Sequence, residues 1–138
     1  MCNEIKLEKE IKRKEYNLIR DSNPSSLQEK IKASINNALM ELLTENNNRN
    51  NYLGIYWPLK GEFDIRFLKE RKNQKLALPA SSNDGLITYH HWSKKNLIPD
   101  SNNIPAPLNE KTLSHNDLSL LLVPALAIDQ EGYRLGYG

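Results

Sequence analysis

The last five residues of the chain combine residue types that bind phosphate groups. Arg134 is followed by Leu135, Gly136, Tyr137 and Gly138. An arginine offers phosphate oxygens a planar fork of N–H donors, and glycines let the backbone approach a ligand closely. A loop of this kind after a strand could cradle the phosphates of a nucleotide. An ordinary turn containing two glycines explains the same spacing.

A second group of cations lies near the N-terminus. Residues 3–20 are rich in Lys and Glu and are predicted to form a helix. One face of this helix carries Lys9, Arg13, Tyr16 and Arg20, and a face about 200° away carries Leu7, Ile11 and Leu18. The apolar face can pack on the domain, which leaves the basic face for an anionic ligand or for solvent.

Glu62 is a candidate for binding a heterocycle. It lies in a loop that begins at Pro58, after a predicted strand over residues 52–57. Ligands of α/β sheets bind outside the carboxyl ends of the strands, where a carboxylate can accept hydrogen bonds from ring N–H groups. A solvated loop acid is the alternative for Glu62. Trp57, at the end of the strand, could line the same pocket or belong to the core.

Apolar periodicity places the remaining elements. It predicts a second helix over residues 27–45, a short helix over 64–72 that Asp64 caps, and further strands over 75–78, 85–92 and 118–123. The last strand is expected to be buried, and 93–107 is expected to be a loop. His90 and His91 point to opposite faces of their strand, so we interpret them as ordinary strand residues. The pattern favours one α/β domain over residues 1–138.

Composition excludes several classes of protein. The chain has 138 residues, a net charge of +2, 26% charged residues and one cysteine. This charge is too small to make nucleic acid the default partner, and a single cysteine gives no disulfide framework. The apolar runs are too short to span a bilayer. We expect a cytoplasmic protein with neither nucleic acid nor membrane as its partner, and we expect it to be a monomer that binds a small molecule.

Four segments resemble, in the same order, those of the 5-formyltetrahydrofolate cyclo-ligase family, also called methenyltetrahydrofolate synthetase. They are Lys9-x-x-x-Arg13, the string YWPLKGEFD over residues 56–64, Ile104-Pro105-x-Pro107, and VPALAIDQEGYRLGYG over residues 123–138. One departure stands in the first segment: the residue before the arginine is usually apolar in the family, and here it is Lys12.

The resemblance implies a fold, a reaction and a set of site residues. The fold is a central, mostly parallel sheet flanked by helices, Rossmann-like in the broad sense. The reaction is the ATP- and Mg²⁺-dependent cyclisation of 5-formyltetrahydrofolate to 5,10-methenyltetrahydrofolate, with Arg134 as the catalytic residue. No metal ligand is assigned, and Asp129 is interpreted as a turn residue. The expected ATP-binding residues are Lys9, Arg13, Arg134, Leu135, Gly136, Tyr137 and Gly138. The expected folate-binding residues are Arg13, Trp57, Glu62, Tyr137 and Gly138.

The family motif continues beyond Gly138 with a further glycine, aromatic residues and an aspartate. The resemblance therefore implies a domain that is truncated within the glycine-rich motif and incomplete at its C-terminus. An inactive copy with at most weak binding of folate or nucleotide is the alternative function. A nucleic-acid binder ranks lower, because glutamates are interleaved with the cations of the first helix.

Overall fold

The computed structural model describes residues 2–45 and 51–136, which form two compact units. One unit contains residues 1–30 and 124–138, and the other contains residues 31–123. Helix α2 (Leu27–Glu45) begins in the first unit and continues into the second. The two helices expected from the sequence, over 3–20 and 27–45, are confirmed as α1 (Cys2–Asp21) and α2.

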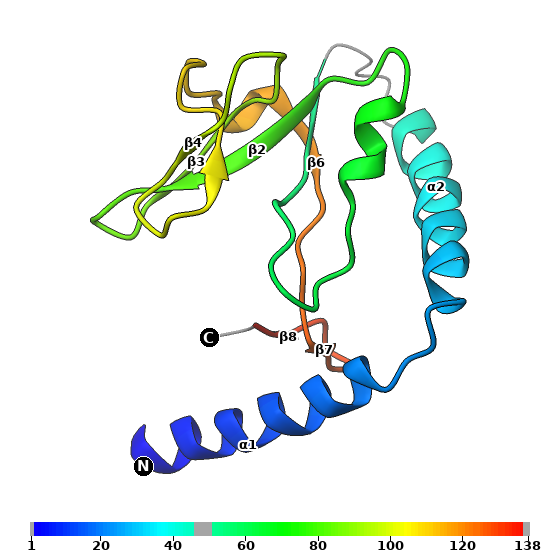
Figure 1. Ribbon diagram of the computed structural model, residues 1–138, viewed down its shortest axis with the longest axis vertical. Helices are drawn as coiled ribbons and strands as arrows, with labels where there is room; N and C mark the ends of the chain where they lie inside the picture. Colours follow the sequence, from blue (N-terminus) through cyan, green and yellow to red (C-terminus); the bar gives the residue numbers. More distant parts are fainter. Residues whose placement is uncertain (1, 46–50, 137–138) are drawn as a thin grey trace. The chain divides into compact units, whose positions relative to one another are not determined.

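The larger unit is built on a four-stranded sheet with the order β3-β2-β1-β6 (Figure 1). Strand β1 (Tyr52–Gly54) is parallel to both neighbours, β2 (Leu76–Ser81) and β6 (Leu118–Leu121). Strand β3 (Ile87–His91) pairs with β2 in the antiparallel direction. The predicted α/β class with a mostly parallel sheet is therefore confirmed.

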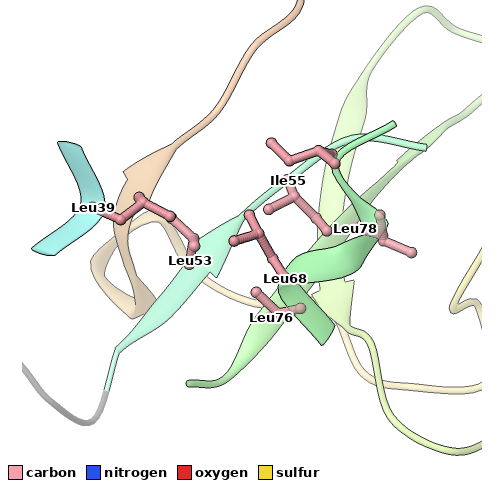
Figure 2. Packing of buried hydrophobic residues seen from close by; sticks show 7 residues of the cluster. Leu39, Leu53, Ile55, Leu68, Leu76 and Leu78 are labelled. Carbon is pink, nitrogen blue, oxygen red and sulfur yellow. The ribbon is translucent and has the colours of Figure 1, made fainter. Parts of the chain in front are cut away.

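The core of this unit joins α2, the sheet and a short 3₁₀ helix, η1 (Arg66–Glu70). Alternate residues of β2, Leu76 and Leu78, share one face of the strand, and α2 contributes Leu39 (Figure 2). Burial of each such side chain stabilises the fold by about 1.5–3 kcal/mol. The buried cluster consists of Leu39, Leu53, Ile55, Ile65, Leu68, Leu76 and Leu78.

Strand β2 is longer than the sequence predicted. We expected Pro79 to end it, but β2 continues to Ser81. The last pairing of β2 with β1 is at Ala77, so the missing N–H of Pro79 faces no neighbouring strand on that side. On the other side Pro79 lies opposite Tyr89 of β3. The strand tolerates the proline because it is an edge strand at this point.

The predicted loop over residues 93–107 contains a small hairpin, so that prediction was wrong. Strands β4 (Ile98–Pro99) and β5 (Pro105–Ala106) pair in the antiparallel direction. The Asp100 carboxylate holds their connection, because it accepts the N–H groups of Asn102 and Ile104 at 2.9 and 3.0 Å. Strands of two residues are too short to leave a periodic signal.

Two further elements differ from their predictions. The helix expected over residues 64–72 is only η1, although Asp64 does accept the N–H of Arg66 at 3.0 Å. The strand expected to be buried over 118–123 is β6, which ends at Leu121 and is half-exposed. Strand β6 lies at the edge of the described sheet and pairs only with β1 there, which leaves Leu121 44% exposed.

The smaller unit contains α1 and a hairpin that the sequence did not predict. Strand β7 (Ala127–Ile128) pairs in the antiparallel direction with β8 (Arg134–Leu135) (Figure 1). The turn expected at Asp129–Gly132 connects them. Within residues 2–45 and 51–136, no helix has the length and apolar character needed to cross a membrane.

Candidate functional site

The smaller unit has a pocket between α1 and the β7–β8 hairpin, with a volume of about 510 Å³. Two predicted ATP-binding residues from opposite ends of the sequence, Lys9 and Arg134, line it together with Leu135. Helical spacing places the side chains that α1 contributes on one face. The lining consists of Ile5, Glu8, Lys9, Lys12, Tyr16, Ala127, Ile128, Asp129, Tyr133, Arg134 and Leu135.

The side chain of Asp129 shapes the hairpin that carries Arg134. Its Oδ1 accepts the N–H groups of Glu131 and Tyr133 at 2.9 and 2.8 Å. Gly132 has φ +89°, a left-handed conformation that glycine adopts at little cost. Asp129 is thus a turn residue, as the sequence indicated. The turn sets the register in which Arg134 lies opposite Ile128.

Arg13 connects α1 to the glycine-rich loop. Its Nε donates a hydrogen bond to the carbonyl oxygen of Gly136 at 3.0 Å, across 123 residues of sequence. This bond uses one of the five N–H donors of the guanidinium. Arg13 therefore positions the loop and retains donors for an anionic ligand. Tyr137 and Gly138, predicted to bind ATP and folate, lie outside the described residues.

In the larger unit, Glu62 is held by its own loop. The loop starts at the carboxyl end of β1, where the Leu122 N–H donates to the carbonyl of Gly54 at 2.8 Å. The Glu62 N–H donates to the Leu59 carbonyl at 3.0 Å, and Glu62 Oε1 accepts the Leu59 N–H at 2.7 Å. Gly61 has φ +85°, which permits this tight turn. The half-buried carboxylate is thereby fixed at the edge of the sheet where α/β proteins bind ligands.

Trp57 packs against the core. Its ring meets Trp92 edge to face, with the ring centroids 6.2 Å apart. The Arg66 guanidinium lies 4.6 Å from the Trp57 ring centroid, a cation–π geometry. The half-buried Trp57 therefore has a structural role, and its contact with folate remains a prediction.

The Asp64 carboxylate orients Arg66. The guanidinium donates from Nε and Nη2 to the two carboxylate oxygens at 2.9 and 2.7 Å. These bonds lower the pKa of Asp64 below its ordinary value of 3.8. Because the pKa of Asp64 is lower in the folded state, the ionised carboxylate stabilises the fold at pH values above the pKa of the unfolded chain. This stabilisation is lost as the pH falls through the pKa of the folded state.

We therefore expect Asp64→Asn to lower the free energy of unfolding by less than about 1 kcal/mol at pH 7, because the pair is exposed. The difference should begin to shrink below about pH 4, the pKa of the unfolded carboxyl, and should be lost as the pH falls through the lower pKa of the folded state. Urea unfolding followed by tryptophan fluorescence at pH 7 and pH 3 measures it, with Glu70→Gln as the control. A difference that is the same at both pH values would contradict this role of Asp64.

Several residues of the pocket were not predicted as site residues. Helical spacing did place Tyr16 on the face of Lys9, although not as a site residue. Lys12 lies three residues after Lys9, so helical spacing could have placed it near that face as well. No sequence pattern marked Tyr133 and Ile128 as pocket residues, because they belong to a hairpin whose strands have only two residues each.

The described residues do not form a protein metal site. Across residues 2–45 and 51–136, no group of three or more His, Cys, Asp and Glu side chains is placed to hold a metal ion. The buried His90 ring makes hydrogen-bonding contacts with Thr88 Oγ1 at 2.8 Å and with the Glu110 carbonyl at 2.9 Å, which accounts for both nitrogens.

No protein-family model and no curated protein matches the chain, but solved structures do. The NMR structure of Aquifex aeolicus 5,10-methenyltetrahydrofolate synthetase is similar with a TM-score of 0.74 and 26% identity. The match covers 94% of this chain and 67% of that one. The 5,10-methenyltetrahydrofolate synthetase of Mycoplasma pneumoniae is similar in fold, with a TM-score of 0.64 and 20% identity over 94% of this chain and 71% of that one.

The chain thus spans about two thirds of the length of the Aquifex synthetase. Its sheet and helices follow that fold, and its sequence carries the four segments of the resemblance in order. The similarity to the Aquifex structure, together with these four segments, supports the resemblance of this chain to the 5-formyltetrahydrofolate cyclo-ligase, or methenyltetrahydrofolate synthetase, family.

Proposed function

We propose that the protein catalyses the ATP-dependent cyclisation of 5-formyltetrahydrofolate to 5,10-methenyltetrahydrofolate, with release of ADP and phosphate. The observation that carries the proposal is the pocket in which Lys9 and Arg134 meet. The hydrogen bond from Arg13 to Gly136 supports it, because it ties a third cation to the glycine-rich loop. Two structures of similar fold are 5,10-methenyltetrahydrofolate synthetases.

The reaction has two steps. The formyl oxygen attacks the γ-phosphorus of ATP, and the bond between that phosphorus and the ADP oxygen breaks. N10 of the folate then attacks the formyl carbon, the carbon–oxygen bond breaks as phosphate leaves, and N10 loses its proton. The first step needs the formyl oxygen in line with the γ-phosphate and cations around the transferring group.

Two residues of the pocket, Lys9 and Arg134, supply those cations in this proposal, with Arg13, which is bonded to the glycine-rich loop. Arg134 contacts the transferring phosphoryl group with its planar fork of donors. Lys9 and Arg13 hold the phosphate chain, with backbone groups of the loop from Leu135 to Gly138. Mg²⁺ would neutralise phosphate charge, and it would arrive bound to ATP, since Mg²⁺ is commonly held by substrate phosphates with few protein ligands.

The folate is assigned to the loop at the end of β1. Glu62 accepts hydrogen bonds from N–H groups of the pterin, and Trp57 lies beside the ring. Arg13, Tyr137 and Gly138 contribute to folate binding as well. The fixed position of the Glu62 carboxylate supports this role, because an oriented acceptor binds a planar heterocycle with little loss of entropy.

A direct assay tests the function. The purified chain is mixed with 5-formyltetrahydrofolate, ATP and Mg²⁺, and the methenyl product is followed by its absorbance. We expect product only when ATP is present, with one ADP released per product. A chain that is folded by circular dichroism, binds neither ATP nor folate in calorimetry and gives no product would overturn the proposal.

A further inference from the structure

Lys12 gives the pocket a cation beyond those of the motif. It lies one helical turn after Lys9 on the same face of α1, and it lines the pocket with Lys9 and Arg134. The carboxylates that line the pocket are Glu8 and Asp129, so its charged side chains sum to one positive charge. A site with this excess gains binding energy with each added negative charge on its ligand.

Lys12 is already paired, but the pair is exposed. Its Nζ lies 3.3 Å from Glu15 Oε2, and the two side chains are 51% and 52% exposed. The hydrogen bond that Lys12 donates to Glu15 raises the pKa of Lys12, so the ammonium is fully charged at neutral pH. Exposed ion pairs of this kind contribute little free energy, and Glu15 does not line the pocket. A more highly charged group inside the pocket can therefore replace Glu15 as the partner of Lys12.

We propose that Lys12 exchanges Glu15 for the terminal phosphates of ATP and makes the pocket prefer a triphosphate to a diphosphate. The inference rests on the proposed function, because that function assigns the pocket to ATP. It makes Lys12 a specificity-determining residue and Glu15 a competitor that weakens nucleotide binding. A pocket with this preference binds the substrate ATP more tightly than the product ADP.

Calorimetric titration of three variants with ATP and with ADP tests the exchange. Lys12→Ala should weaken ATP binding by roughly five- to tenfold, as expected for one charge-assisted contact, and should weaken ADP binding less. Glu15→Gln should tighten ATP binding by about twofold, because it removes the competing carboxylate. Lys14→Ala is the matched control: Lys14 is exposed on the same helix, does not line the pocket and should leave both affinities unchanged.

Two more measurements test whether Lys12 acts on the phosphates and through its charge. Tripolyphosphate, which has no base or sugar, should lose affinity for Lys12→Ala by the same factor as ATP. Lys12→Leu, which keeps a long side chain without the charge, should repeat the alanine result and so exclude an effect of lost side-chain size.

The outcomes separate this inference from the proposed function. ATP binding that Lys12→Ala leaves intact but Arg134→Ala weakens would overturn the role of Lys12 and leave the function standing. Equal losses for ATP and ADP would overturn the preference, and unchanged or weaker ATP binding in Glu15→Gln would overturn the exchange. A parent chain that binds neither ATP nor tripolyphosphate would overturn both proposals.

Discussion

Arg134→Ala should lower the ATP-dependent turnover of 5-formyltetrahydrofolate by about 100-fold or more, the usual cost of losing one donor to the charge that develops in a transition state. The side chain is exposed and lines the pocket. In the described part of the chain, its one hydrogen bond, to the carbonyl oxygen of Pro124, is long at 3.5 Å. Removing the side chain should therefore cost the fold little.

The kinetic form of the loss distinguishes catalysis from binding. If Arg134 acts on the transferring phosphoryl group, kcat should fall, whereas loss of uniform ATP binding would raise KM and leave kcat unchanged. Arg134→Lys should recover only part of the activity, because an ammonium replaces a planar fork of donors by a point charge. Arg71→Ala, in the sheet unit and outside the pocket lining, is the matched control. A kcat within twofold of the parent value would exclude Arg134 from the chemistry.

The helices of the chain could be predicted closely because each has a long periodic pattern of apolar residues with a clear boundary. Residues 3–20 and 27–45 carry several turns of periodic pattern, and Pro24 separates them. The sheet strands could be located from apolar composition, but their ends could not. Pro79 ends a strand only where its missing N–H faces a partner, and that depends on how far β1 extends. The ends of these strands are set by pairing between strands that are distant in the sequence, and a local sequence pattern does not reveal that pairing.

The candidate site, too, could be predicted from the sequence only in part. Helical spacing placed Lys9 and Arg13 on one face of α1, but their meeting with Arg134 and Gly136 followed only from the resemblance. Tyr133 could not be predicted, because it reaches the pocket through a turn held by one aspartate side chain. The sequence predicted a loop from Pro58 but not the tight turn within it. The hydrogen bond from the Leu59 N–H orients the Glu62 carboxylate, and no sequence pattern predicts this bond.

The fixed orientation of the Glu62 carboxylate leads to the second large expected effect, which is on folate binding. We expect Glu62→Gln to weaken binding of 5-formyltetrahydrofolate by roughly ten- to a hundredfold, the cost of replacing an ionised acceptor by a neutral one. ATP affinity should change by less than about twofold, because the carboxylate faces the pterin in this proposal. The glutamine Oε1 can still accept the Leu59 N–H, so the turn should remain closed. The variant thus isolates charge from loop geometry.

Calorimetry with each ligand alone measures both affinities, and Glu70→Gln, an exposed glutamate of η1, is the matched control. Gly61→Ala completes the comparison, since a side chain at φ +85° strains the turn and should misplace the carboxylate without removing its charge. Folate binding should then fall in both variants, through charge in Glu62→Gln and through geometry in Gly61→Ala. Equal losses of folate and ATP affinity in Glu62→Gln would instead mean that the carboxylate supports the fold as a whole, and the pterin would need another acceptor.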